Sequence, residues 1–250
     1  MGLLSKEIFV CLDCETTGLD PVKDRLLEVA VVTFNNTEIL SSFETLIDPQ
    51  SLIPESSIAI HHITPEMVAG KPKIEEVLPN LFKLIGNYTI VGHGISFDVD
   101  LLMNAAKRNQ IPCNLHTNKQ LDTLRLARNY GQSPVNSLEK LREHFLIEPE
   151  GAHRAMNDVV VNVQVFKRLI ERYKTTEQLF EVLNRPIRMK TMPLGPHKGK
   201  ALSQIPVEYL KWAAYKDFDQ DLLFSIRSEL KKRASGNGFS QGNNPFLPLK

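Results

Sequence analysis

The sequence predicts an α/β fold in which a mixed β-sheet is covered by helices. Apolar, β-prone runs joined by short connections fill the first 48 residues, and such connections favour antiparallel neighbours. Further along, short apolar runs alternate with segments of helical periodicity. Strands first, and then strands alternating with helices, are typical of a mixed sheet with helices packed on it. Hydrophobic residues make up 42% of the chain and charged residues 24%, as in ordinary globular proteins.

Three strands are expected near the N-terminus, over Glu7–Leu12, Leu26–Phe34 and Phe43–Ile47. Each run is rich in apolar, β-branched or aromatic residues. The segment Gly18–Pro21 supplies the turn between the first two strands, because glycine and proline favour turn conformations.

Helices and strands alternate in the next part of the chain. Apolar residues spaced by three and four predict a helix over 74–85. A short strand is expected over Tyr88–Val91, followed by a helix over Asp98–Arg108 with Ser96 as its N-cap. Another short strand leads into Leu121.

Three further helices are predicted, over Asn136–Phe145, Ala155–Tyr173 and Thr176–Asn184. The first begins with a capping residue, Asn136 or Ser137. The second is the longest, and one of its faces carries an apolar stripe that should point inward, formed by Val159, Val163, Phe166 and Ile170.

The composition changes after Tyr173, which predicts a division of the chain. We expect a first domain over residues 1–175, a helix and linker over 176–200, a small basic C-terminal domain over 201–233 and a disordered tail over 234–250. The linker is inferred from the prolines, glycines and basic residues before position 200. The tail is inferred from its richness in glycine, asparagine and proline.

The three cysteines indicate a reduced intracellular protein, because their odd number and spacing fit neither a disulfide framework nor a zinc site. No run approaches the roughly 18 apolar residues of a membrane span. A cytoplasmic protein without membrane contact is therefore expected. The net charge of +1 excludes a protein that holds nucleic acid by bulk positive charge.

Asp13 and Glu15 form an unusual pair at the end of the first strand. Because they lie two residues apart, their carboxylates project from the same face. Two adjacent anions repel each other, and a hard divalent cation bound by their oxygens would compensate for this. The alternative is that the pair simply ends a strand at a solvated turn.

Two further acids and a histidine lie at junctions between elements. Asp98 follows a strand-to-helix junction, and Asp158 lies at the start of the longest helix, five residues after His153. Five residues turn an ideal helix by about 140°, so His153 can approach Asp158 only from a loop before the helix. Alternatively, Asp98 is a helix N-terminal anion and His153 a surface loop residue.

Three segments resemble the exonuclease motifs of the DnaQ-like family of the DEDDh type. They are FVCLDCETTGLDP, IVGHGISFDVDLL and HRAMNDVVVNVQVF. Supporting matches lie in 24–30, 60–64 and 122–128, and the resemblance covers roughly residues 6–173. This family comprises proofreading, repair and RNA-trimming 3′–5′ exonucleases, among them proteins of the exodeoxyribonuclease X and DNA polymerase III epsilon types. A bacterial source is expected.

The resemblance implies a ribonuclease-H-like fold, with a five-stranded mixed sheet flanked by helices. It implies that the metal ligands are Asp13, Glu15, Asp98 and Asp158, and that His153 is the general base. It further implies two Mg²⁺ or Mn²⁺ ions that clamp the scissile phosphate. Histidine suits the role of base because its ordinary pKa of about 6.5 lies near neutral pH.

The same resemblance implies substrate contacts by Thr16, Thr17 and Leu19 beside the terminal nucleotide, and by His61 near its phosphate or sugar. For Leu19 the alternative is ordinary turn packing. Two positions depart from the family pattern: the chain has Gly94 in place of the usual asparagine, and His62 in place of the usual glycine. Neither is a metal ligand, so the departures bear on substrate preference.

The expected partner is DNA, at single-stranded or frayed 3′ ends, in repair or proofreading. RNA is the first alternative, because the reaction attacks a phosphate that both polymers share, and a protein distinguishes them chiefly at the 2′-OH. A non-catalytic nucleic-acid or clamp adaptor is a further alternative, but it would have lost a carboxylate or the histidine. The sequence specifies no oligomeric state.

The segment Met192–Trp212 resembles a small domain that follows the exonuclease domain in some bacterial enzymes related to exodeoxyribonuclease X. Basic and aromatic residues alternate in it, as on a strand-binding surface: Lys198, Lys200, Tyr209, Lys211 and Trp212. Alternatively, its aromatic side chains form the core of the small domain. Residues 1–185 hold 19 Lys+Arg and 24 Asp+Glu, whereas residues 186–250 hold 11 and 5.

The segment Gln220–Phe224 resembles the short motif with which bacterial replication proteins bind the sliding clamp. In the same segment, Leu222, Ile226 and Leu230 form an apolar helical stripe. The stripe favours a core position over contact with the replication clamp.

Overall fold

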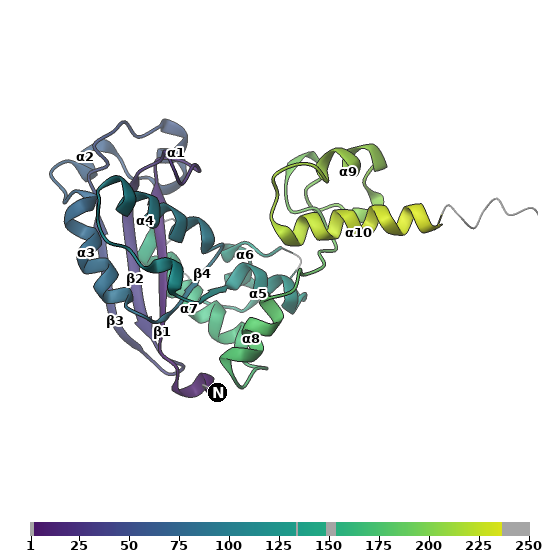
Figure 1. Ribbon diagram of the computed structural model, residues 1–250, viewed down its shortest axis with the longest axis horizontal. Helices are drawn as coiled ribbons and strands as arrows, with labels where there is room; N and C mark the ends of the chain where they lie inside the picture. Colours follow the sequence, from purple (N-terminus) through teal and green to yellow (C-terminus); the bar gives the residue numbers. More distant parts are fainter. Residues whose placement is uncertain (1–2, 134, 149–153, 237–250) are drawn as a thin grey trace, which may run out of the picture. The chain divides into compact units, whose positions relative to one another are not determined.

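The computed structural model describes residues 3–133, 135–148 and 154–236. Within these residues the chain forms a five-stranded sheet in the order β3-β2-β1-β4-β5 (Figure 1). The strands are β1 (Phe9–Thr16), β2 (Leu26–Phe34), β3 (Ile39–Leu46), β4 (Thr89–Gly92) and β5 (Gln120–Asp122). The first three are antiparallel, whereas β4 is parallel to β1 and β5 to β4. The predicted mixed, ribonuclease-H-like sheet is confirmed.

The helices around the sheet come from the segments between and after the strands. They are α1 (Glu55–His61), α2 (Pro65–Val68), α3 (Ile74–Ile85), α4 (Ser96–Arg108), α5 (Thr123–Tyr130), α6 (Leu138–His144), α7 (Ala155–Ile170) and α8 (Thr176–Leu183). Short 3₁₀ helices are η1 (Leu4–Lys6) and η2 (Leu115–Thr117).

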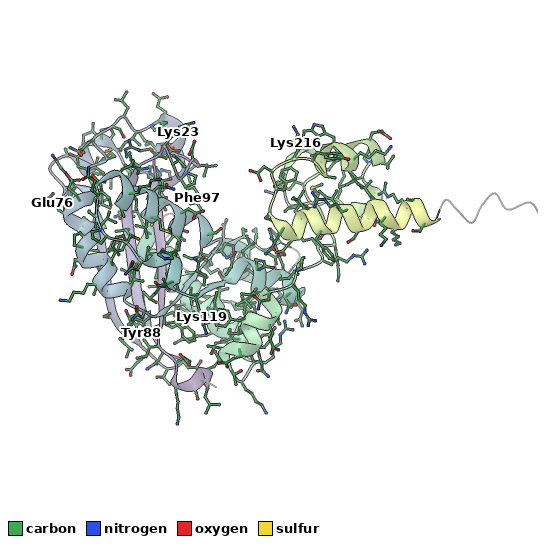
Figure 2. All side chains as sticks on the ribbon, in the orientation of Figure 1. Lys23, Glu76, Tyr88, Phe97, Lys119 and Lys216 are labelled. Carbon is green, nitrogen blue, oxygen red and sulfur yellow. The ribbon has the colours of Figure 1, made fainter. Side chains whose placement is uncertain are left out.

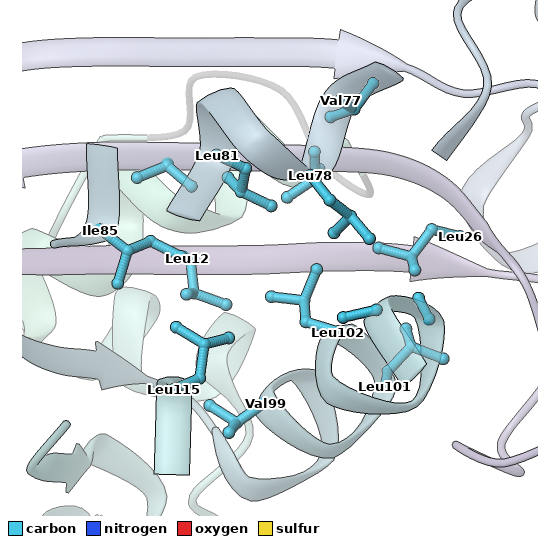
Figure 3. Packing of buried hydrophobic residues seen from close by; sticks show 14 of the residues in the cluster. Leu12, Leu26, Val77, Leu78, Leu81, Ile85, Val99, Leu101, Leu102 and Leu115 are labelled. Carbon is cyan, nitrogen blue, oxygen red and sulfur yellow. The ribbon is translucent and has the colours of Figure 1, made fainter. Parts of the chain in front are cut away.

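Successive residues of a strand point to opposite faces of a sheet, and β1 divides its side chains in this way. Val10 and Leu12 join the core formed with α3 and α4 (Figure 3). On the other face, the Phe9 ring lies 5.2 Å from the Phe166 ring of α7. Helices α3 and α4 therefore cover one face of the sheet and α7 covers the other.

The predicted inward stripe of α7 is confirmed, since its four apolar residues are all buried. Because α7 packs against both β1 and β2, its first turn is held over the centre of the sheet. Helices α5 and α6 pack against α7, and α8 packs against α5 and β5.

Two predicted boundaries are wrong in ways that affect the site. Strand β1 continues to Thr16, because it stays paired with β2 up to Leu26, so the two acids lie inside the strand rather than at its end. Ser96 is the first residue of α4, whose N-cap position is Ile95. Helices α1, α2 and α5 were not predicted from the sequence; the N-cap of α5, Asp122, accepts a hydrogen bond from the Leu124 amide.

The chain divides into two compact units, Met1–Asn184 and Arg185–Lys250. The second unit contains η3 (Gly195–His197), η4 (Leu202–Gln204), α9 (Val207–Ala213) and α10 (Gln220–Gly236). Its core includes Met192 and Leu210 together with the predicted stripe of α10. Leu222 is completely buried there, which supports a core position for the clamp-like segment.

The segment 176–200, which we expected to hold a helix and a linker, is shared between the two units. Helix α8 belongs to the first unit, whereas residues from Arg185 onward belong to the second. Two amides at the start of the second unit are bonded to α10: Ile187 donates to the Asp221 carboxylate and Met189 to the Ser225 hydroxyl. Helix α10 extends to Gly236, and the rest of the predicted disordered tail lies outside the described residues.

Candidate active site

The acids of β1 point toward α7. Asp13 and Glu15 have the same parity along the strand as Phe9, whose ring contacts that helix. Glu15 lies directly opposite Glu28 in the pairing of β1 with β2. This face of the sheet therefore gathers three acidic side chains within a short distance.

A fourth acid, Asp158, comes from the first turn of α7. Asp13, Glu15 and Asp158 each offer a carboxylate oxygen, and these three oxygens lie within 4.8 Å of one another. The structure thus brings together three of the four predicted metal ligands, from two elements that are far apart in the sequence.

Asp98, the fourth predicted ligand, is not part of this group of three described residues. It lies in the first turn of α4, is buried, and accepts a hydrogen bond from the Cys14 thiol. The loop before α4 is fixed by Asp122, whose carboxylate accepts a hydrogen bond of 2.9 Å from the Gly94 amide. Gly94 has a φ of 76°, a conformation that glycine adopts readily.

The charges of these acids are strongly coupled. Burial raises the pKa of Asp13 well above its usual range, and the charges of Asp98, Glu15 and Asp158 raise it further. Burial likewise raises the pKa of Glu15 to about 7, with Asp158 and Glu28 adding to the shift. Burial also raises the pKa of Asp98 to about 7. Asp98 therefore acts on Asp13 electrostatically, although it lies outside the group of three.

Glu28 and Arg154 form a clamp at the start of α7 that sequence reasoning missed. The Glu28 side chain is completely buried, and both of its oxygens accept hydrogen bonds from the Arg154 guanidinium at 3.1 Å. The Ala155 amide donates to the same carboxylate. The sequence did contain a feature that points to this clamp: Glu28 is the one charged residue in strand β2, so its charge needs a partner there. The clamp fixes the N-terminus of α7 and hence the turn that carries Asp158.

His153, the predicted general base, lies outside the described residues. Its neighbour Arg154 is the N-cap residue of α7 and is held by Glu28. The predicted role of His153 therefore stays a prediction from the resemblance.

The predicted substrate residues of the first motif form a tight turn after β1. The Thr17 hydroxyl donates to the Asp24 carboxylate at 2.9 Å, and Thr16 donates to the Gly18 carbonyl at 2.6 Å. A Cβ at Gly18 would lie 2.5 Å from the Asp24 carboxylate, so the turn requires glycine there. The two threonines are buried in this turn, whereas Leu19 at its tip is 90% exposed.

The two histidines after α1 differ in environment. His61 is only 2% exposed, and its Nδ1 accepts a hydrogen bond from the Ile63 amide at 3.0 Å. Its Nε2 has no hydrogen-bond partner among the described residues, and burial lowers its pKa. His62 has a φ of 59°, in the left-handed region, which explains why a glycine is usual at this position.

This arrangement is suited to binding divalent cations. Carboxylate oxygens are the preferred ligands of Mg²⁺ and Mn²⁺, and a cation would relieve the repulsion that raises the pKa values. No helix in the described part of the chain is both long and apolar enough to cross a bilayer. Fold and site together define a nuclease-like α/β protein with a carboxylate cluster at the centre of its sheet.

Residues 10–166 match the family model described as "Exonuclease", which covers well over half of the chain. The chain belongs to the DnaQ-like exonuclease family. Residues 177–226 match a second model, described as "Putative quorum-sensing-regulated virulence factor".

Relatives and solved structures agree with this family. The chain is 34% identical over 164 residues to DNA polymerase III subunit epsilon of Aquifex aeolicus, covering 65% of this chain and 80% of that one. It is 32% identical over 193 residues to the PolC-type DNA polymerase III of Caldanaerobacter subterraneus, of which the match spans 14%.

Among structures, exonuclease X in complex with 5′ overhanging duplex DNA superposes with a TM-score of 0.57 at 27% identity. That match covers 70% of this chain and 98% of the other. Exonuclease I of E. coli, in complex with a dA16 oligonucleotide, has a TM-score of 0.60 at 23% identity, which supports the fold.

Proposed function

We propose that this protein is a metal-dependent 3′–5′ exonuclease that removes nucleotides from DNA 3′ ends. The observation that carries the proposal is the convergence of Asp13, Glu15 and Asp158, whose oxygens lie within 4.8 Å of one another. Membership of the exonuclease family supplies the reaction class, and hydrolysis of a phosphodiester bond is what such a carboxylate cluster serves.

Asp13, Glu15 and Asp158 would hold the divalent cations, with Asp98 as the fourth ligand. Two Mg²⁺ or Mn²⁺ ions bound there would activate water and stabilise the charge that develops on the leaving 3′ oxygen. The four acids fit a pair of divalent cations, because the raised pKa values of Asp13, Glu15 and Asp98 reflect an excess of negative charge in a place that is largely shielded from solvent.

His153 would accept the proton of the attacking water, as the resemblance to the DEDDh type implies. The Glu28–Arg154 clamp beside it would fix the end of the segment that carries this histidine. Leu19 would pack against the terminal base, since it is the exposed side chain of the turn. Thr16, Thr17 and His61 would contact the terminal nucleotide, as the resemblance implies.

DNA is the proposed substrate because the named relatives are DNA polymerase III proteins and the similar structures hold DNA. The work of such an enzyme would be proofreading or repair at single-stranded or frayed 3′ ends. An exoribonuclease would share the same fold and ligands, so the assay must include RNA.

The proposal is tested with 3′-labelled and 5′-labelled single-stranded and duplex DNA and RNA, incubated with Mg²⁺, Mn²⁺ or EDTA. We expect mononucleotides from the 3′ end of DNA, no cleavage in EDTA, and no cleavage by Asp13→Ala. Asp100→Asn is the matched control, because Asp100 is an exposed acid two residues from Asp98.

Cleavage that survives EDTA would contradict the metal-dependent mechanism. Release from the 5′ end would contradict the polarity. Preference for RNA of the same length would replace the proposed substrate with the alternative one.

A further inference from the structure

The second unit carries a row of aromatic rings on one side of α9. The His197 ring lies 4.5 Å from the Tyr209 ring, and the Tyr209 ring lies 5.2 Å from that of Trp212. The Lys216 ammonium lies 4.7 Å from the centre of the Trp212 ring. The row thus joins a loop, a helix and the residues after the helix into one surface, near Lys216 in Figure 2.

The outer part of this row is not core. Tyr209 packs against the core of the unit, but Trp212 is 51% exposed; Tyr215, whose amide donates to the Trp212 carbonyl just after the helix, is 92% exposed. Two large rings that stay in solvent lose the favourable free energy that burial would provide. Exposed aromatic rings of this kind are typical of surfaces that bind a partner. The structure therefore separates the two sequence alternatives: Tyr209 supports the core, whereas Trp212 and Tyr215 face solvent.

Lysines accompany the row: Lys216 lies over the Trp212 ring, and two others follow His197 in the chain. The loop Thr191–Ala201 is closed by a bridge between its ends and carries Lys198 and Lys200, next to the His197 that contacts α9. Lys198, Lys200 and Lys216 are exposed and pair with no carboxylate in the described part of the chain. Lys211 differs, because it forms an ion pair of 3.0 Å with Glu208.

We propose that this surface binds single-stranded nucleic acid, with bases stacked on Trp212 and Tyr215 and phosphates beside the unpaired lysines. Aromatic rings interleaved with free cations are the arrangement by which proteins bind single strands without sequence preference. A duplex hides the faces of its bases, so stacking selects a single strand over a double one. We name this surface, formed by His197, Lys198, Lys200, Tyr209, Trp212, Tyr215 and Lys216, the aromatic platform.

Charge favours a polyanion as the occupant. From Arg185 onward the chain holds 12 Lys+Arg against 5 Asp+Glu, a net charge of +7. The choice of nucleic acid among polyanions rests on the proposed function, since an exonuclease already acts on such a strand. Binding is separable from cleavage, so the experiment measures binding alone.

Trp212 is the single tryptophan of the chain, and its emission reports on the platform directly. The full chain in EDTA is titrated with oligonucleotides of dT and rU, about 15 nucleotides long, and with a duplex of equal length. We expect saturable quenching by the single strands, weaker quenching by the duplex, and weaker binding at higher salt. Heparin, a polyanion without bases, should not quench.

Variants are compared by the anisotropy of a labelled single strand. Tyr215→Ala should weaken binding about tenfold, which is near the lower end of the range for the loss of one stacked base. Folding should not change, because the Tyr215 side chain is exposed. Lys216→Ala should reduce the dependence of binding on salt: the slope of the logarithm of the binding constant against the logarithm of the salt concentration should fall by about one. Phe224→Ala is the control, because Phe224 is exposed on α10 of the same unit and outside the platform.

Three results would overturn the proposal: no quenching of Trp212 although the strand binds, equal quenching by heparin, or equal binding by Tyr215→Ala and wild type. Each leaves the exonuclease proposal untouched, because no cleavage is measured. Conversely, quenching without any exonuclease activity in Mg²⁺ would support the platform and contradict the proposed function.

Discussion

The two units of this protein place charge in opposite ways. The first holds 18 Lys+Arg against 24 Asp+Glu, a net charge of −6, and its acids Asp13, Glu15 and Asp158 lie half-buried at the centre of a sheet. The second has a net charge of +7 and leaves its unpaired lysines in solvent beside exposed rings. The overall charge of +1 conceals this difference.

The difference follows from what each site has to do. Like charges that lie close together in a half-buried place repel one another, so a bound cation would stabilise the cluster of Asp13, Glu15 and Asp158. The cluster also requires a fixed geometry, here provided by strand pairing and by the clamp at α7. Exposed cationic side chains cost the folded state little free energy and remain free to move, which suits the binding of a flexible nucleic-acid strand. The half-buried acids of the first unit are therefore suited to one fixed binding geometry, whereas the exposed lysines of the second unit can follow a flexible ligand.

The largest expected effect comes from removing an acid of the cluster. Asp158→Asn should lower exonuclease activity at least about 10³-fold, because the cations lose a charged ligand close to the developing charge. The folded protein should be no less stable, since a repelling charge has gone. Activity is measured by release of 3′-terminal nucleotides, and stability by urea unfolding. Nearly full activity of this variant would show that Asp158 is not a metal ligand.

The next effect concerns ion pairs in the two units. Arg154→Ala leaves the buried Glu28 without its partner, and we expect a loss of about 2–3 kcal/mol in the free energy of unfolding. Lys211→Ala breaks the exposed pair with Glu208 and should cost about 0.5 kcal/mol or less. Similar losses in the two variants would contradict the contrast between buried and exposed charge.

The pH dependence of metal stabilisation should be smaller but measurable. Because the folded-state pKa values of Glu15 and Asp98 are raised to about 7, their contribution to stability is full below about pH 4 and is lost as the pH rises through 7. Mg²⁺ competes with these protons. We therefore expect Mg²⁺ to raise the melting temperature at least about 3 °C more at pH 8 than at pH 5.5. Asp13→Asn should abolish that difference. An equal effect of Mg²⁺ on the wild type at both pH values would show that Mg²⁺ and the protons do not compete for the same carboxylates.

A small stabilising effect is expected at the turn that follows α1. His62→Gly should stabilise the protein by about 0.5–1 kcal/mol, because glycine adopts the left-handed conformation at position 62 more readily. Urea unfolding measures the change, and binding by the second unit should not alter. If the variant is destabilised, His62 makes a contact that outweighs its backbone strain.

Sequence patterns predicted the sheet and most helices, because periodicity records which side chains face the core. The motif resemblance predicted the acids that meet at the site. What both missed at the site depends on long-range pairing: β1 extends to Thr16 because β2 continues beside it, and Glu28 reaches Arg154 across 126 positions. The exposure of Trp212 was also undecided, since a helical spacing of three residues from Tyr209 fits both core and surface.

The central claim is that the half-buried acids Asp13, Glu15 and Asp158 of the first unit form a divalent cation site. Electron paramagnetic resonance of Mn²⁺ counts the ions bound to the full chain without any substrate. We predict tight binding by wild type and by Asp100→Asn, and its loss in Asp13→Asn. Equal binding by Asp13→Asn and wild type would contradict the account.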